Sequence, residues 1–235
     1  MKFENLKFEN LSFGYIADNP IIKNVDFNFP LGEIVWIRGS STSGKSIFIR
    51  LMSGAIEPTA GKIIINNQDI HELGYLHYAS ILKHIGFGFD GTGLLVNQSL
   101  ENNLALPLRY HSTWSEAEIQ TWVHTLMDIF RVTHVKDQRP AFVTQSLYKT
   151  FLLLRAFVLK PEMMIFINPL SSLDDSNRDS FISLLELFKK DYGLKHVFII
   201  SDDEPQLEKL NPVKIWVQDK KIVREDSREE QRITG

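Results

Sequence analysis

The sequence contains no cysteine, so disulfide bonds and thiolate metal sites are excluded, as is typical of proteins from reducing compartments. It also lacks any run of the roughly 18 apolar residues that a membrane span requires. Residues 1–5 lack the apolar core of a secretion signal. The net charge of −3 shows no basic excess of the kind that favours nucleic acid. We therefore expect no nucleic-acid partner, and membrane contact only through partner proteins.

What the chain does contain is the composition of an ordinary globular protein, with 43% hydrophobic and 23% charged residues. Its length of 235 residues suits one domain, or one domain with an inserted subdomain. The seven histidines show no metal-ligand spacing, so a zinc site is not expected.

The segment Gly39–Ser46 fits the phosphate-binding pattern G-x-x-x-x-G-K-[ST]. The apolar run Ile34–Ile37 before it predicts a buried strand, and residues 47–52 after it predict a helix. In this context the glycines allow backbone N–H groups to face a phosphate, and the helix N-terminus adds partial positive charge. Lys45 is expected to pair with the β- and γ-phosphates, and Ser46 to hold Mg²⁺. The residues predicted here to bind a nucleoside triphosphate are Gly39, Ser40, Ser41, Thr42, Ser43, Gly44, Lys45, Ser46 and Ile47.

Strand and helix patterns alternate along the chain, which predicts an α/β fold with a mostly parallel sheet. The pentapeptide at 2–6 is repeated at 7–11. Side chains alternate along a strand, so two copies five residues apart would turn opposite faces to the core and cannot be equivalent in one sheet. The second copy is predicted to be the strand. Alternation at Val25, Phe27 and Phe29 predicts another. Further strands are expected at 62–65, 163–167 and 196–200, and in a hairpin of 213–217 with 221–223.

The stretch from about 94 to 157 is mainly helical in pattern. Thr113 and Glu116 predict a capping box at the start of one helix, and Thr144 begins another that ends near Val158. The first helix carries an apolar stripe that we predict to be core. This stripe consists of Ile119, Trp122, Val123, Leu126, Met127 and Phe130.

With these landmarks placed, nearly the whole chain resembles the nucleotide-binding domain of ABC transporters. Tyr15 matches the aromatic residue that stacks on adenine, and Pro58–Ile63 matches the P-x-x-G-x-I segment after the first helix. The resemblance implies a P-loop NTPase fold of ABC type, with a mostly parallel sheet, an antiparallel N-terminal β part and a helical subdomain insert. The segment implied to contact a partner subunit is Ser171, Ser172, Leu173 and Asp174.

The resemblance also implies how the chain is divided. We expect a single domain whose ATP-binding core spans about 1–90 and 158–223, with a helical subdomain at about 91–157 and a loose tail at 224–235.

Residues 97–109, with 91–95 and 219–223, are similar to the ATPase of MCE-type lipid transporters, the phospholipid-asymmetry (Mla-type) system of Gram-negative envelopes. That similarity implies lipid cargo, membrane permease subunits as partners, and ATP with Mg²⁺ as cofactors. It also implies a second nucleotide-binding subunit, either identical or an intact paralogue. The expected location is cytoplasmic, peripheral on the inner face of the inner membrane.

The positions that carry hydrolysis in this family are altered here. Ile167 stands where an Asp helps to hold Mg²⁺, and Asn168 where a Glu activates the attacking water. Asp202 replaces the histidine that faces the γ-phosphate, and Asp90 replaces a glutamine. General-base assistance is worth roughly 10²–10⁴ in rate. We therefore expect ATP binding with weak or absent hydrolysis.

The LSGGQ signature, which contacts nucleotide across a dimer, aligns with Val143, Thr144, Gln145, Ser146 and Leu147. Both of its glycines are missing, so the backbone can no longer approach a phosphate closely, although Thr144 keeps a hydroxyl. A complex with an intact paralogue is favoured over a homodimer, because unhydrolysed ATP at both sites leaves no obvious way to reset the machine.

Two other functions stay open. An active ATPase could use Asp90 as a Mg²⁺ ligand and Asp202 or Asp203 as the base. The competing interpretation is that Asp202, Asp203 and Glu204 start a helix, with their carboxylates at its positive end. The chain could also be an ABC-fold scaffold or regulator without a transporter. We favour a pseudo-ATPase subunit of an ABC transporter complex that handles lipids.

Overall fold

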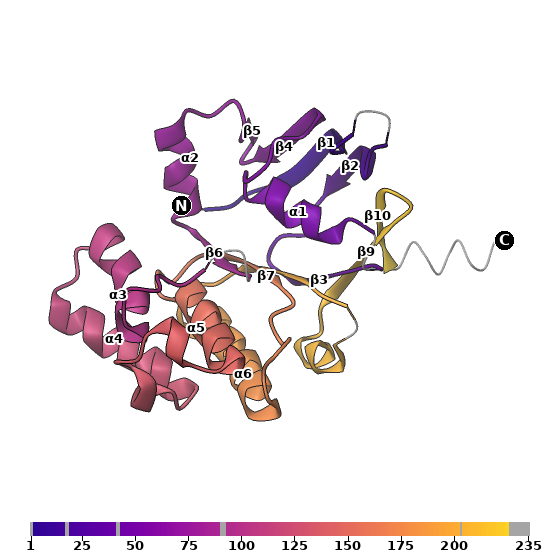
Figure 1. Cartoon of the computed structure of the whole chain (residues 1–235). Helices are drawn as coiled ribbons and strands as arrows, with labels where there is room; N and C mark the ends of the chain where they lie inside the picture. The colour runs from indigo at the N-terminus through magenta and orange to yellow at the C-terminus, as the bar shows by residue number, and fades with distance from the viewer. Residues whose placement is uncertain (1, 17–18, 41–42, 90–92, 203, 226–235) are drawn as a thin grey trace. The chain divides into compact units, whose positions relative to one another are not determined.

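The computed structural model describes residues 2–16, 19–40, 43–89, 93–202 and 204–225. It divides into two compact units, Met1–Leu82 with Lys195–Gly235, and Lys83–Leu194 (Figure 1). Parallel strands, antiparallel strands and a set of helices are all present, so the predicted α/β class is confirmed. The finer division into a core, a subdomain and a tail stays a prediction.

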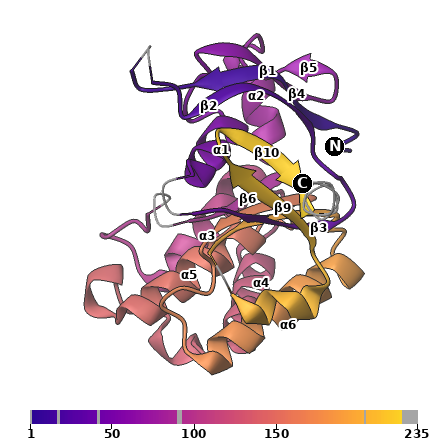
Figure 2. The same cartoon turned by 90° about the vertical axis from the view of Figure 1, so that its right-hand side faces the viewer.

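The first unit contains an antiparallel sheet with the strand order β2-β1-β4-β5. The second copy of the repeated pentapeptide lies inside β1, as predicted, whereas Phe3 of the first copy is buried outside any strand. Figures 1 and 2 both place helix α1 (Lys45–Met52) against this sheet, where Phe48 stacks on Phe8 with ring centroids 5.7 Å apart. The strands are β1 (Leu6–Phe13), β2 (Ile22–Asn28), β4 (Ala60–Ile65) and β5 (Gln68–Asp69).

The same unit holds a second set of strands, in the order β10-β9-β3-β8. Strand β3 pairs in parallel with both β8 and β9, and Ile37 lies opposite Ile200. The carboxyl ends of β3 and β8 therefore meet at one edge, which brings together the segments that follow them. The strands are β3 (Ile34–Arg38), β8 (His196–Ile200), β9 (Val213–Gln218) and β10 (Lys221–Arg224).

The second unit combines a parallel pair, β6 (Ile85–Gly88) and β7 (Met163–Ile167), with helices. The predicted apolar stripe of α4 is buried throughout, and the Trp122 indole N–H donates to the Val158 carbonyl at 2.9 Å. That stripe is core, as predicted. The helices are α3 (Leu100–His111), α4 (Glu116–Ile129), α5 (Gln145–Phe157) and α6 (Asp175–Asp191), with short 3₁₀ helices η2 (Thr133–Val135) and η3 (Pro140–Phe142).

Two details of the helices differ from the sequence-based expectation. The capping box of α4 is formed by Ser115 and Glu118, whereas Thr113 and Glu116 were predicted to form it. Both pairs fit the S/T-x-x-E spacing, and Glu116 instead forms an ion pair with Arg109. In the first unit, α2 (Tyr75–Leu82) was not predicted, whereas the 3₁₀ helix η4 (Pro205–Leu210) follows the helix start proposed at 202–204.

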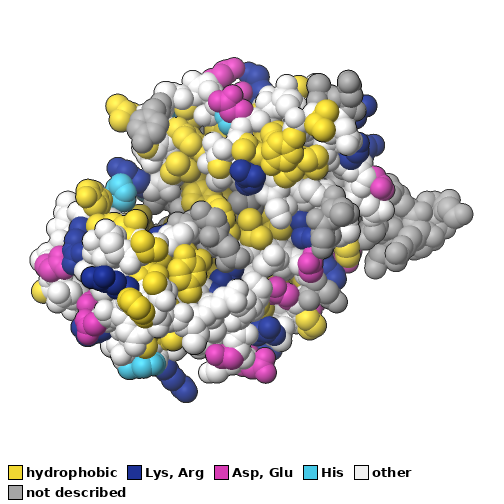
Figure 3. Space-filling view, viewed as in Figure 1, with side chains coloured by type: hydrophobic (Ala, Val, Ile, Leu, Met, Phe, Trp, Pro, Cys, Tyr) yellow, Lys and Arg dark blue, Asp and Glu magenta, His cyan; other side chains and the backbone are white. Residues whose placement is uncertain are grey.

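The surface carries both signs of charge. On the face shown in Figure 3, Lys and Arg side chains are interspersed with Asp and Glu side chains. Across the described ranges, no helix combines the length and the apolar character that crossing a bilayer would require.

Candidate functional site

The phosphate-loop segment joins β3 to α1 in the first unit, as predicted. The Lys45 ammonium donates to the carbonyl oxygens of Gly39, at 2.9 Å, and Ser40, at 3.2 Å. The backbone N–H of Ser43 also donates to the Ser40 carbonyl, at 3.0 Å. These bonds close the loop around a buried lysine. Ser41 and Thr42, which were predicted to contact nucleotide, lie outside the described residues.

Both motif glycines occupy places that a larger residue would not fit. Gly44 has φ +81°, and a Cβ atom there would lie 2.4 Å from Cγ2 of Ile21. A Cβ atom on Gly39 would lie 2.6 Å from the Val217 carbonyl oxygen. Both positions therefore favour glycine, in agreement with the phosphate-loop pattern.

Asp202 approaches the same lysine from the end of β8. One of its carboxylate oxygens lies 2.6 Å from Lys45 Nζ, and the two side chains are 62% and 7% exposed, respectively. The interpretation of residues 202–204 as a helix start is confirmed in position, because Glu204 is the N-cap of a helix, but Asp202 itself pairs with Lys45. The helix there is η4, which begins at Pro205, and its N-cap residue Glu204 forms no side-chain capping bond.

The residue before Asp202 is held firmly. The Trp36 indole N–H donates to the Ser201 hydroxyl at 2.8 Å, and the Ser201 backbone N–H donates to the Ile37 carbonyl at 3.3 Å. Trp36 and Ser201 are both fully buried. The position of Asp202 beside the loop is therefore a consequence of the parallel pairing between β3 and β8.

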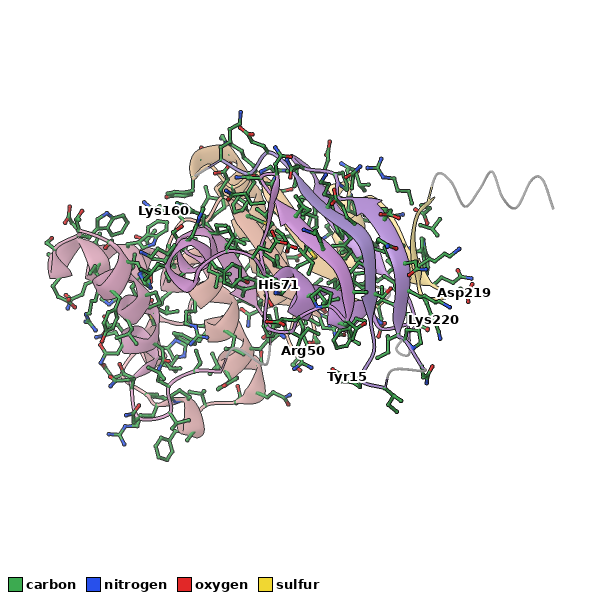
Figure 4. All side chains as sticks on the ribbon, turned by 90° about the horizontal axis from the view of Figure 1, so that it is seen from above. Tyr15, Arg50, His71, Lys160, Asp219 and Lys220 are labelled. Carbon is green, nitrogen blue, oxygen red and sulfur yellow. The ribbon has the colours of Figure 1, made fainter. Side chains whose placement is uncertain are left out.

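A cavity of about 660 Å³ lies beside the phosphate loop. One of its walls is the tip of the β9–β10 hairpin, where Asp219 and Lys220 have φ angles of 50° and 64°. Figure 4 labels these two residues. This wall was not predicted; parallel pairing of β9 with β3 places Trp216 beside Arg38, at the end of β3 that leads into the phosphate loop. The lining consists of Asn19, Pro20, Ile21, Gly39, Ser40, Ser43, Trp216, Val217, Gln218, Asp219 and Lys220.

Tyr15, the predicted platform for adenine, is 66% exposed. Its hydroxyl accepts a hydrogen bond from Arg50 Nη1 at 3.1 Å, and Figure 4 shows these two side chains beside each other. The Phe13 ring packs edge-on against it, with centroids 5.2 Å apart. Arg50 lies on α1, so the tyrosine is tethered to the helix that follows the phosphate loop. No sequence pattern pointed to Arg50.

Among the positions expected to support Mg²⁺ and hydrolysis, Ser46 offers a hydroxyl, whereas Ile167 and Asn168 offer no carboxylate. Ser46 is exposed in the first turn of α1, while the Ile47 N–H donates to the Gly44 carbonyl at 2.8 Å. Ile167 ends β7 with a hydrocarbon side chain that cannot bind a metal. Asn168 has φ 43°, and its carbonyl accepts a bond from the Ser171 hydroxyl at 2.7 Å. Asp90 and Asp203, the candidate substitutes, lie outside the described residues.

The segments expected to contact a partner subunit cap two helices of the second unit. Thr144 is the N-cap of α5, and its hydroxyl accepts from the Leu147 N–H at 3.3 Å. Asp174 is the N-cap of α6, and its carboxylate accepts from the Asn177 N–H at 2.8 Å. Leu173 is buried, whereas Ser172 is exposed. Contact across a dimer by 143–147 and 171–174 stays a prediction.

Residues 22–171 match the family model described as ABC transporter. The chain belongs to the ABC transporter family. It carries the ATP-binding domain of that family, whose members bind ATP, typically with Mg²⁺, dimerise, and work with membrane permease subunits.

Among curated proteins, the chain is similar to methionine import ATP-binding proteins. It is 28% identical over 199 residues to MetN of Bradyrhizobium diazoefficiens, covering 83% of this chain and 57% of that protein. It is 30% identical over 183 residues to MetN of Rhodopseudomonas palustris, covering 78% and 49%. The chain therefore spans about half of the length of these relatives. Neither name refers to lipid transport, so neither supports the MCE-type prediction.

Solved structures confirm the ABC-type P-loop fold. A dimeric bacterial ABC transporter cassette superposes with a TM-score of 0.83 at 23% identity, covering 93% of this chain and 97% of that one. A structure described as the ATP-binding subunit of an ABC transporter gives 0.82 at 22% identity, covering 97% and 93%. At this level of identity, the likeness shows the fold alone.

Proposed function

We propose that this chain is the ATP-binding subunit of an ABC transporter complex, and that it binds ATP but hydrolyses it poorly or not at all. The observation that carries nucleotide binding is the built phosphate loop, in which buried Lys45 is held by the carbonyls of Gly39 and Ser40. Such a loop serves phosphates through its N–H groups and its lysine.

The roles of the binding residues follow from this geometry. Lys45 would supply positive charge to the terminal phosphates, and Tyr15 would offer its exposed ring to the base. Ser46, exposed in the first turn of α1, would present a hydroxyl to Mg²⁺. Bound ATP with Mg²⁺ would supply the phosphoryl group whose hydrolysis drives transport in this family.

Weak hydrolysis is supported by three positions that fail in different ways. Ile167 provides no metal ligand, and Asn168 can orient a water but cannot accept its proton. The carboxylate of Asp202 adds negative charge beside Lys45, where a transition state that gains negative charge needs hydrogen-bond donors. Each loss removes stabilisation of the transition state rather than binding alone.

The partners and location are proposed on the same basis. We propose permease subunits and a second, catalytically intact nucleotide-binding subunit, with the complex on the cytoplasmic face of the inner membrane. Lipid cargo rests on the similarity of 97–109 to MCE-type ATPases. Methionine import is the second candidate, because it is the activity in the names of the curated relatives.

The test uses the full chain purified without its partners, so that no second nucleotide-binding subunit contributes ATP binding or hydrolysis. Calorimetry should show ATP binding that Lys45→Ala abolishes and that Lys62→Ala, at an exposed lysine of the same unit, leaves intact. Phosphate release with Mg²⁺ should stay near background. No heat at millimolar ATP would overturn nucleotide binding. Steady phosphate release that disappears in Asp90→Ala or Asp202→Ala would instead establish an active ATPase.

Mass spectrometry of the complex purified with its native partners tests the partners. We expect a permease, a bound lipid and one intact nucleotide-binding paralogue. Two copies of this chain with no other nucleotide-binding subunit would refute the heteromeric arrangement. Absence of any permease would favour the scaffold alternative, and retained methionine would favour the amino-acid cargo.

A further inference from the structure

The three N–H groups of the Lys45 ammonium all have acceptors in the protein. They donate to the Gly39 carbonyl at 2.9 Å, the Ser40 carbonyl at 3.2 Å and the Asp202 carboxylate at 2.6 Å. An ammonium has three donors and no acceptor, so its hydrogen-bonding capacity is filled. A phosphate that binds Lys45 must therefore replace one of these partners.

Asp202 is the partner that a phosphate would replace or meet. The two carbonyls belong to the backbone of the loop, whereas the Asp202 carboxylate is a side-chain group that is 62% exposed. It is also the one negatively charged partner, so it occupies the ammonium in the way that a phosphate oxygen would. Its backbone cannot withdraw easily, because Ser201 is bonded to both Trp36 and Ile37.

We propose that Asp202 makes this phosphate loop select nucleoside diphosphates over triphosphates. The inference rests on the proposed function, because it concerns the same nucleotide site. In phosphate loops the backbone N–H groups cradle the α- and β-phosphates, and the lysine reaches toward the β- and γ-phosphates. The γ-phosphate thus depends most on Lys45 and meets the Asp202 charge. A diphosphate keeps the contacts with the loop backbone and avoids most of that repulsion.

With this selection, the nucleotide site would be occupied mainly by a nucleoside diphosphate. A subunit that prefers ADP would stay occupied without hydrolysis, and ATP would compete only when its concentration is high. Asp202 is then a specificity-determining residue, because its carboxylate occupies the Lys45 ammonium and repels the γ-phosphate.

The experiment compares ADP and ATP binding by titration calorimetry, each with Mg²⁺, to the full chain and to two variants. Asp202→Asn removes the charge with little change in shape. Glu57→Gln removes one exposed carboxylate of the same unit as a control. The wild type should bind ADP about tenfold more tightly than ATP, a difference of about 1.4 kcal/mol. Asp202→Asn should tighten ATP about tenfold and ADP less than about threefold, and Glu57→Gln should change neither.

The outcomes separate this inference from the proposed function. Binding of both nucleotides with an ATP-to-ADP ratio that Asp202→Asn leaves unchanged overturns the selection and leaves nucleotide binding standing. If neither ADP nor ATP binds to any of the three proteins, the proposed function is overturned, and the inference with it. Asp202→Ala provides a second charge-removing variant, and thermal unfolding of each protein verifies that it is folded.

Discussion

The Trp36 indole N–H donates to the Ser201 hydroxyl at 2.8 Å, and neither residue has any exposed surface. Trp36 lies on β3 and Ser201 directly follows β8, so this bond joins the two strand ends from which Lys45 and Asp202 approach each other. A buried indole N–H needs an acceptor, because water cannot reach it.

Replacing this acceptor should destabilise the fold. Ser201→Ala leaves the Trp36 N–H buried without a partner, which costs about 1–3 kcal/mol in the free energy of unfolding. Urea denaturation monitored by tryptophan fluorescence measures this cost. The control is Ser180→Ala, because Ser180 bonds the Ser176 carbonyl on the exposed side of α6; we expect a change within about 0.5 kcal/mol. Equal changes in the free energy of unfolding for the two variants would show that the buried Trp36–Ser201 bond stabilises the fold no more than the exposed bond does.

The two glycines Gly44 and Gly32 allow strain to be separated from a clash. Both have positive φ angles, +81° and +88°, but only a Cβ on Gly44 meets another side chain, at 2.4 Å from Ile21. Each alanine substitution should cost roughly 1–2 kcal/mol of stability through its backbone conformation. Gly44→Ala should also shift the phosphate loop and abolish nucleotide binding, whereas Gly32→Ala should preserve it. Fluorescent-nucleotide titration decides between them, and intact binding by Gly44→Ala would contradict the loop geometry.

The start of α4 provides a test between two overlapping capping boxes, Ser115 with Glu118 and Thr113 with Glu116. Ser115→Ala removes the N-cap hydroxyl and should lower the free energy of unfolding by about 1 kcal/mol. Thr113→Ala should have no such effect, although its spacing to Glu116 fits the same pattern. Urea denaturation of both variants measures the difference. A loss of stability confined to Thr113→Ala would instead support the predicted capping box of Thr113 and Glu116.

The same cap should make stability depend on pH. Hydrogen bonds from the Ser115 hydroxyl and N–H hold the pKa of Glu118 below its ordinary value of 4.5. A carboxyl group with a lowered pKa stabilises the folded state above its unfolded pKa, and this contribution is lost as the pH falls through the folded pKa. Glu118→Gln should therefore be less stable than the wild type at neutral pH, and the difference should shrink well below pH 4.5. A constant difference across that range would contradict the role of the charge.

Several parts of the molecule could be predicted because their signals are local. The strand, loop and helix around Lys45 follow from a short motif and its immediate flanks. Strands β7 and β8 begin and end where predicted, because short apolar runs bounded by polar residues form buried strands. Asp174 and Thr144 cap their helices where a polar residue precedes a helical pattern.

The amino-acid sequence by itself determined the α/β class and the phosphate-loop pattern between a strand and a helix, since each depends on neighbouring residues. The loss of catalytic groups at Ile167 and Asn168 stays a prediction from side-chain chemistry. Tertiary structure alone decided that Asp202, 157 positions beyond Lys45, pairs with that lysine. It also decided that the β9–β10 hairpin lines the cavity and that Arg50 holds Tyr15. These relationships depend on which strands become parallel neighbours and on how loops approach one another. Periodicity along a single chain carries no record of either.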